Sequence, residues 1–224
     1  MTHRLTLQSI KQVTHNVVHL TFDKPEGFDF TPGQATELAL DQDGWRDEGR
    51  PFTFTSLPEE DTLDFVIKSY PDHDGVTARI PKLRPGDHVL IGDAWGAIED
   101  KGDGVFIAGG AGVTPFISIL RAKLAAKGTL DGNTLLFSNK TEADIILKDW
   151  FEKAEGLKTQ WVVTDQKDPR YESGPIGVKM LKELVTPGRD ICYVCGPDSM
   201  VEDLPKKLEA AGVPDAQIVT EDFS

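Results

Sequence analysis

Cysteine is scarce in this sequence, which has only Cys192 and Cys195 among its 224 residues. Both lie in the run ICYVC, which reads as a strand, so their side chains would face opposite sides with Cα atoms about 10 Å apart. That separation is too large for a disulfide. Zinc and iron–sulfur sites need about four ligands, and neither a second cysteine pair nor an HExxH pattern occurs. We therefore expect no disulfide, no metal centre and a reducing, cytoplasmic compartment.

Long apolar runs are missing as well. The longest, residues 105–120, is interrupted by three glycines and one proline, whereas a transmembrane helix needs about 20 mostly apolar residues. The first ten residues, MTHRLTLQSI, contain no apolar core of the kind that a secretory signal carries. We therefore expect neither a signal peptide nor a membrane partner.

Basic residues are outnumbered, because 24 Lys and Arg stand against 37 Asp and Glu, for a formal net charge of −13. Nucleic-acid binding usually needs a basic face, and anionic lipid attracts basic segments, so the charge argues against both partners. Hydrophobic residues make up 39% and charged residues 27%, which is the composition of a globular protein. The length corresponds to one large domain or two small ones.

The first half of the chain has the pattern of a β-protein. Residues 1–98 contain about six short runs rich in β-forming residues, separated by turns such as Pro32–Gly33 and Pro85–Gly86. One short helix is expected near Val76 and is limited by Pro81. This half predicts a small antiparallel β-barrel.

The second half instead alternates strands with helices, after a hydrophilic linker at Glu99–Asp103. Such alternation is typical of parallel βαβ units. The sequence therefore predicts two domains, an antiparallel β-barrel over 1–98 and an α/β parallel-sheet domain over 104–224. Within the second domain we expect strands at 104–108, 134–138, 160–164 and 191–195, and helices at 114–127, 143–153, 178–184 and 200–211.

The run Gly109–Pro115 (GGAGVTP) lies between an expected strand and an expected helix. A glycine-rich turn lets the backbone approach a pyrophosphate, and the following helix N-terminus offers N–H groups and a favourable dipole. Pro115 suits the first helical turn. The run departs from GxGxxG, which argues against a standard Rossmann dehydrogenase. A nucleotide-binding turn is favoured here over a turn without a ligand.

Three further segments carry weaker signals. Arg50–Ser56 (RPFTFTS) alternates Phe and Thr after an arginine suited to phosphate. Lys68–Thr77 ends in a Gly-led helix start that can hold phosphate, and Tyr193–Pro197 ends a strand in a turn, where parallel sheets gather ligands. Taken singly, each segment is more often an ordinary strand, loop or turn. Residues 68–84 are also locally basic, with four Lys and Arg against two Asp.

In combination, these segments resemble the ferredoxin–NADP reductase superfamily of flavoproteins. RPFT is similar to the family's Arg-x-Tyr-Ser/Thr flavin motif, with Phe52 in place of tyrosine, and RPFTFTS is closest to the NADH-dependent cytochrome reductases. The other motifs follow in the family's order, namely IKSY (67–70), GVT (75–77), GGAGVTP (109–115), CGP (195–197) and the terminal Glu221–Asp222–Phe223.

The resemblance implies FAD as the flavin. By resemblance, Arg50 would bind the FAD pyrophosphate, Phe52 would lie against the isoalloxazine ring and Thr53 would hydrogen-bond flavin N5. The implied flavin-binding residues are Arg50, Pro51, Phe52, Thr53, Ile67, Lys68, Tyr70, Gly75, Val76 and Thr77.

The resemblance also implies a nicotinamide nucleotide and a set of catalytic residues. Cys195 would lie beside nicotinamide C4, Phe223 would cover the other flavin face, and Glu221 would serve a proton and hydrogen-bond network there. With Thr53 these form the implied catalytic set. The implied nucleotide-binding residues are Gly110, Gly112, Val113, Thr114, Pro115, Ser138, Lys140, Asp165, Cys195, Gly196 and Pro197, of which Thr114 would touch both cofactors.

The choice between NADH and NADPH depends on two charged residues. Lys140 could pair with the 2′-phosphate of NADPH. Asp165 matches an acid that NADH-using relatives place against the adenosine ribose, where a carboxylate would repel that phosphate. The balance favours NADH and leaves NADPH open.

By resemblance, the chain is expected to be an FAD-dependent NAD(P)H reductase that passes electrons to a separate one-electron carrier such as flavodoxin or ferredoxin. Such carriers are typically acidic, so an acidic reductase needs a local basic patch to dock them. The segment Lys68–Arg84 is the candidate. Two alternatives stay open, the reductase component of a multicomponent oxygenase and a non-catalytic flavin- or nucleotide-binding subunit of a larger complex.

Overall fold

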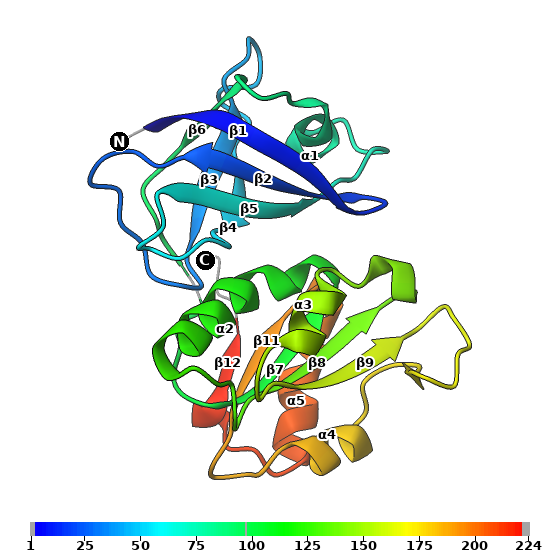
Figure 1. The fold of residues 1–224 in the computed structure, drawn as a ribbon. Helices are drawn as coiled ribbons and strands as arrows, with labels where there is room; N and C mark the ends of the chain where they lie inside the picture. The colour runs from blue at the N-terminus through cyan, green and yellow to red at the C-terminus, as the bar shows by residue number, and fades with distance from the viewer. Residues whose placement is uncertain (1–2, 97, 221–224) are drawn as a thin grey trace.

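The computed structural model describes residues 3–96 and 98–220, which form two six-stranded sheets (Figure 1). In Figure 1 the N-terminal sheet, blue to green, lies above the C-terminal sheet, green to red. The first is antiparallel and the second is parallel. The two-domain fold predicted from the sequence is therefore confirmed. Among the residues that the structure describes, no helix is both long enough and apolar enough to cross a membrane.

The N-terminal sheet is barrel-like. Its strands are β1 (His3–Thr14), β2 (Val17–Asp23), β3 (Ala35–Leu40), β4 (Arg50–Thr53), β5 (Thr62–Lys68) and β6 (His88–Ile91). They pair in the order β4-β3-β6-β1-β2-β5. The backbone N–H of Thr55, just after β4, donates to the carbonyl of Asp64 in β5 (2.8 Å). This bond draws the two edge strands of the sheet together.

The two faces of β5 serve different cores, because alternate residues of a strand point to opposite sides. Leu63, Phe65 and Ile67 are buried inside the barrel. Val66 points the other way and packs into the core of the C-terminal domain. One strand therefore forms both the barrel wall and part of the contact between domains.

The predicted short helix of the barrel is confirmed as α1 (Val76–Arg79). It begins after Gly75 and passes into the 3₁₀ turn η1 (Ile80–Lys82), which contains Pro81. Proline cannot continue the helical hydrogen-bond ladder, which explains the early end of α1.

The C-terminal domain packs helices on both faces of its sheet. Its elements are β7 (Gly104–Gly109), η2 (Gly110–Val113), α2 (Thr114–Lys127), β8 (Thr134–Asn139), η3 (Glu142–Asp144), α3 (Lys148–Lys153), β9 (Lys158–Val163), β10 (Glu172–Ser173), α4 (Val178–Leu184), β11 (Ile191–Cys195), α5 (Asp198–Ala210), η4 (Asp215–Gln217) and β12 (Ile218–Thr220). The strand order is β10-β9-β8-β7-β11-β12. Helices α2 and α3 cover the face toward the barrel, and α4 and α5 cover the opposite face. Because both faces are covered, β7 is buried at every position.

One expected helix is wrong. Residues 143–153 do not form a single helix but the 3₁₀ turn η3 followed by α3. Thr141 and Asp144 close a capping box, in which the Thr141 N–H donates to the Asp144 carboxylate (2.9 Å). Leu147 then takes a left-handed conformation with φ 51°, so the backbone cannot run through as one helix. The expected helices at 114–127 and 178–184 are confirmed.

Hydrogen bonds fix α2 against the barrel. The N–H of Gly33 donates to Ser118 Oγ (3.0 Å). The guanidinium of Arg121, further along α2, donates to the Thr55 carbonyl (2.7 Å) and to the Glu60 carboxylate (2.6 Å). The start of α2 is therefore held at a defined position relative to the barrel.

The linker Glu99–Asp103 is held by buried polar groups. The ammonium of Lys123, which is 6% exposed, donates to the Asp100 carboxylate (2.7 Å) and the Gly102 carbonyl (3.0 Å). The hydroxyl of Tyr193 in β11 accepts from the Lys101 N–H (2.8 Å). The connection between the domains is thus tied to α2 and β11.

Candidate functional site

A cavity of about 350 Å³, here called the central cavity, lies between the two domains. Its walls come from β4, β5 and α1 on the barrel side and from the turns after β7 and β11 on the other side. Residues from every motif within the described ranges line it. The predicted site residues among them are Pro51, Phe52, Thr53, Ile67, Lys68, Tyr70, Thr77, Gly110, Gly112, Thr114, Cys195, Gly196 and Pro197.

The central cavity lies where the order of the parallel sheet reverses. From β7 the chain continues to β8 on one side and later returns to β11 on the other side. Open α/β sheets bind ligands beyond the carboxyl ends of their strands at such a point. The turn η2 and the pair Gly196–Pro197 occupy that place.

Glycine lets the turns after β7 and β11 touch. A Cβ on Gly112 would collide with the backbone carbonyl of Cys195 and lie 2.5 Å from the nitrogen of Gly196. Gly110 has φ 52°, a left-handed conformation that glycine adopts at little cost. A Cβ on Gly110 would lie 3.9 Å from Lys68 Nζ. The turn therefore presents bare backbone to the cavity, with a lysine ammonium beside it.

The barrel wall of the central cavity combines aromatic surface with a cation. Phe52 is half-buried and Thr53 is 8% exposed. Lys68 Nζ lies 5.9 Å from the ring centre of Tyr70, and Tyr70 is 44% exposed. A flat ligand that carries negative charge suits this combination.

Five predicted residues lie beside the central cavity without lining it. The guanidinium of Arg50 is exposed and donates to the Gly49 carbonyl (2.6 Å). A Cβ on Gly75 would meet nothing within 4 Å, so the space next to the start of α1 is open. Val76, Val113 and Pro115 are buried, and they therefore support the neighbouring backbone.

Ser138 lies in β8 beside Gly109 of β7, and Lys140 and Asp165 follow β8 and β9 at the carboxyl edge of the sheet. A cavity of about 480 Å³, here called the edge cavity, is lined by Ser138, Thr164 and Met200 among others. The N–H of Asp165 donates to the Lys140 carbonyl (2.9 Å), and Thr164 Oγ1 donates to Asp165 Oδ1 (2.8 Å). The backbones of Lys140 and Asp165 are thus paired next to Thr164, which lines this cavity. Glu221 and Phe223 lie outside the residues that the structure describes.

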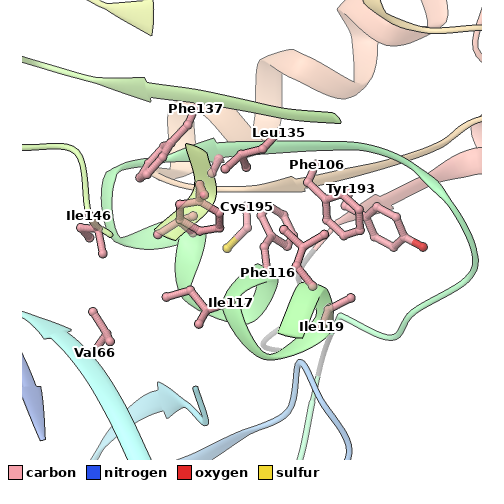
Figure 2. Packing of buried hydrophobic residues seen from close by; sticks show 14 of the residues in the cluster. Val66, Phe106, Phe116, Ile117, Ile119, Leu135, Phe137, Ile146, Tyr193 and Cys195 are labelled. Carbon is pink, nitrogen blue, oxygen red and sulfur yellow. The ribbon is translucent and has the colours of Figure 1, made fainter. Parts of the chain in front are cut away.

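The two cysteines face opposite sides of β11. Burial, with a smaller contribution from Asp190, raises the pKa of Cys192 to about 12, and this residue packs under α4 and α5. Cys195 instead packs with α2 and lines the central cavity. Figure 2 shows its sulfur among aromatic side chains that include Phe116. Of the two, Cys195 is the one placed at the site.

The set of predicted residues omitted three that also line the central cavity, namely Val66, Gly109 and Ala111. Gly109 and Ala111 belong to the GGAGVTP run, so taking the whole run as the site would have included them. Val66 follows from strand alternation, because it shares the outer face of β5 with Lys68.

Comparison with known proteins identifies both domains. A family model described as an FAD-binding domain matches residues 2–84, and one described as an oxidoreductase NAD-binding domain matches residues 106–206. The chain combines an FAD-binding domain with an oxidoreductase NAD-binding domain, in the fold of the ferredoxin–NADP reductase superfamily. It is a flavin-dependent NAD(P)H oxidoreductase with FAD and a nicotinamide nucleotide as cofactors.

Relatives and solved structures agree with this family. NADH-cytochrome b5 reductase 2 of Mycosarcoma maydis is 28% identical, over 92% of this chain and 65% of that protein. The propane 2-monooxygenase reductase component of Mycolicibacterium smegmatis is 26% identical, over 99% of this chain and 67% of that protein. The fold matches a ferredoxin NADP+ reductase from Neisseria gonorrhoeae with bound FAD and NADP, with TM-score 0.84, 23% identity and 98% coverage of each chain. The chain thus spans about two thirds of the length of both curated relatives.

The central cavity fits the cofactors of this superfamily. Gly112 lets the turn after β7 pack against the backbone of Cys195, so that both turns line the cavity, and Lys68 supplies a cation for phosphate beside Tyr70. Open space next to Gly75 leaves room for a diphosphate at the start of α1. The donor set is therefore appropriate for FAD on the barrel side and a nicotinamide nucleotide on the sheet side.

Proposed function

We propose that this reductase takes electrons from NADH and passes them to a separate one-electron carrier protein such as flavodoxin or ferredoxin. The observation that carries the proposal is the meeting of Thr53 and Lys68 with Gly112 and Cys195 around one cavity. Bound FAD supplies the step between a two-electron hydride donor and a one-electron acceptor. The barrel domain, proposed as residues 1–98, would hold FAD, and the α/β domain, residues 104–224, would hold the nucleotide.

The residues of the central cavity have distinct proposed roles. Thr53 contributes a hydroxyl group at flavin N5, and Phe52 contributes a ring face to the isoalloxazine. Lys68 and Arg50 neutralise the pyrophosphate of FAD. Cys195, which is 3% exposed, contributes a small side chain beside nicotinamide C4 and keeps water out of that position. These contacts orient the two reacting atoms, which is the main contribution a protein makes to hydride transfer.

NADH is the proposed nucleotide because of the position of Asp165. Its carboxylate is held on the carboxyl edge of the sheet by the backbone bond to Lys140 and the hydroxyl of Thr164. A negative charge there binds ribose hydroxyls well and repels a 2′-phosphate. Lys140 follows β8 next to it and favours the 2′-phosphate of NADPH. We therefore expect NADH to be preferred but NADPH to be used as well.

The proposed docking surface for the carrier is the rim formed by Lys68–Arg84. Thr77 of α1 lines the central cavity, and Lys82 and Arg84 follow as exposed residues. They supply positive charge near the flavin side in a chain of net charge −13. An acidic carrier would be attracted locally although the whole proteins repel each other.

Charge reversal tests this surface. The double substitution Lys82→Glu with Arg84→Glu should slow electron transfer to ferredoxin or flavodoxin by about tenfold at low salt. It should leave the rate of flavin reduction by NADH unchanged. Lys179→Glu with Lys182→Glu on α4, where both residues are exposed, is the matched control and should change neither rate. Equal slowing of both half-reactions by the first variant would refute this docking surface.

Steady-state turnover tests the function itself. The FAD-loaded protein should oxidise NADH with ferricyanide as an artificial one-electron acceptor, and kcat/KM should be higher for NADH than for NADPH. Turnover with neither nucleotide would reject the reductase proposal and favour a non-catalytic subunit. A higher kcat/KM for NADPH would reject only the choice of nucleotide.

A second candidate function is the reductase component of an oxygenase. The observation that favours it is the match to the propane 2-monooxygenase reductase component over 99% of this chain. Reduction of a purified oxygenase component at a rate above that of ferredoxin and flavodoxin would support this candidate.

A further inference from the structure

Two neighbouring loops meet at the carboxyl edge of the parallel sheet. The β8 loop (residues 140–147) follows β8 and carries Lys140, and the β9 loop (residues 164–171) follows β9 and carries Asp165. Figure 1 shows the β9 loop in yellow beyond the end of β9. The two loops are joined at their start, where the Asp165 N–H donates to the Lys140 carbonyl (2.9 Å). Further along, side chains join them.

The guanidinium of Arg170 binds one carboxylate from each loop. Its Nη2 donates to Glu142 Oε2 in the β8 loop (2.8 Å) and to Asp168 Oδ2 in the β9 loop (2.6 Å). Its Nε donates to Asp168 Oδ1 (3.0 Å). Both carboxylates are half-buried, and a planar guanidinium that binds a carboxylate through two nitrogens holds it in a defined orientation. These contacts, here called the Arg170 bridge, therefore fix the two loops to each other.

Glu142 is the point of the β8 loop where contacts from the β9 loop converge. Its backbone N–H donates to Gln166 Oε1 (3.0 Å). Hydrogen bonds from Tyr171 and Arg170 hold the pKa of the Glu142 carboxyl below its ordinary value, and they outweigh the opposing effect of desolvation. The carboxylate is therefore charged at neutral pH, and three residues of the β9 loop bind Glu142.

An exposed arginine in this position could instead bind the 2′-phosphate of NADPH directly, because guanidinium groups suit phosphate. The donors Nε and Nη2 of Arg170 are, however, directed at Asp168 and Glu142. A phosphate bound through these nitrogens would have to displace both carboxylates. The geometry therefore favours a bridge between the loops over a direct contact with the nucleotide.

We propose that Arg170 and Glu142 are positioning residues for the adenosine end of the nicotinamide nucleotide. The Arg170 bridge sets the spacing of the two loops and so holds Lys140 and Asp165 in place against the adenosine ribose, because residues that touch a ligand need others to hold them. This inference rests on the proposed function, which assigns the ribose to these two residues. Loss of the bridge weakens binding of the adenosine end whatever its 2′ substituent, and leaves the reaction at the nicotinamide end unchanged.

Isothermal titration calorimetry of the FAD-loaded protein tests the bridge with two fragments of the adenosine end, 5′-AMP and 2′,5′-ADP. Arg170→Met and Glu142→Gln should each weaken binding of both fragments by about fivefold, the contribution of one well-formed exposed ion pair. The double variant should lose less than the product of the two single effects, since both substitutions break the same bridge. Arg189→Met is the matched control, because Arg189 is 71% exposed against 62% for Arg170 and binds Asp190 (2.7 Å) before β11, at the amino edge of the sheet. It should change neither affinity.

Kinetics separate positioning from a general loss of structure. In both single variants KM for NADH should rise about fivefold, while the rate of flavin reduction at saturating NADH stays unchanged. Weaker binding of 2′,5′-ADP alone in Arg170→Met would identify Arg170 as a phosphate ligand and overturn the inference. Unchanged affinity for both fragments in Arg170→Met and Glu142→Gln would overturn it as well. If the unsubstituted protein bound neither fragment and NADH did not bleach its flavin, the proposed function would be rejected, and this inference with it.

Discussion

The backbone of Gly112 lies directly against the carbonyl of Cys195, with no room for a side chain between them. This contact joins the turn after β7 to the end of β11, at the point where the sheet order reverses. The same contact places both turns in the wall of the central cavity. The geometry of the nucleotide side of the site therefore depends on one glycine.

Gly112→Ala is expected to separate the two turns, because its Cβ would meet backbone atoms that cannot rotate away. We expect a loss of about 1–3 kcal/mol in the free energy of unfolding and a raised KM for NADH. Gly92→Ala is the matched control, because a Cβ there would have its nearest neighbour at 3.8 Å. It should change the free energy of unfolding by less than about 0.5 kcal/mol. Chemical denaturation and steady-state kinetics measure both effects, and equal behaviour of the two variants would contradict this role of Gly112.

Nucleotide preference should respond to the pair at the carboxyl edge of the sheet. Asp165→Asn removes the carboxylate that would repel a 2′-phosphate, so the ratio of kcat/KM for NADPH to that for NADH should rise about tenfold. Lys140→Met should lower the same ratio. The free energy of unfolding should change little in either variant. An unchanged ratio in both would place the discrimination elsewhere in the edge cavity.

Stability of the domain connection should depend on Lys123 more than on Lys127. Both ammonium groups contact Asp103, at 3.1 and 3.0 Å, but the Lys123 side chain is 5% exposed and that of Lys127 is 51% exposed. Lys123→Met should lower the free energy of unfolding by about 1–3 kcal/mol, because removing one partner of a buried ion pair leaves the other charge uncompensated. Lys127→Met should cost less than about 1 kcal/mol. Similar losses for the two variants, measured by urea unfolding, would contradict the buried role of Lys123.

The Asp103 carboxylate, which both lysines contact, gives a prediction about pH. Burial of Asp103 opposes its ionisation, but hydrogen bonds from Lys127, Lys123 and Asn133 outweigh burial and hold its pKa below the ordinary 3.8. A lowered pKa in the folded state stabilises the protein above the unfolded pKa, and this contribution is lost as pH falls through the folded value. The loss in the free energy of unfolding caused by Asp103→Asn should therefore be largest above about pH 5. This loss should become smaller below pH 3.8. A deficit independent of pH would show that Asp103 acts through packing alone.

The resemblance of the ordered motifs to the ferredoxin–NADP reductase superfamily was enough to predict that Thr53, Lys68, Gly112 and Cys195 share one site. The α2 and α4 boundaries also followed from the local sequence pattern. The break at Leu147 did not, because a left-handed leucine is stabilised by tertiary packing and leaves no trace in helical periodicity. Nor did the burial of Lys123, since its acceptors come from the linker and not from its own helix.

The role of Thr53 can be separated from the binding of FAD. Thr53→Val keeps the volume of a side chain that is 8% exposed and removes the hydroxyl proposed for flavin N5. The FAD content should stay near that of the unchanged protein, while the rate of flavin reduction falls about tenfold, the effect of one lost hydrogen bond. Loss of FAD in proportion to the loss of rate would show that Thr53 serves only to bind the flavin.

The most direct test of the account is anaerobic mixing of the FAD-loaded protein with NADH, and separately with NADPH, while flavin absorbance at about 450 nm is followed. If the central cavity brings the two cofactors together, NADH should bleach this band rapidly and NADPH should do so more slowly. A flavin band that neither nucleotide bleaches, or no such band after addition of FAD, would contradict the central claim.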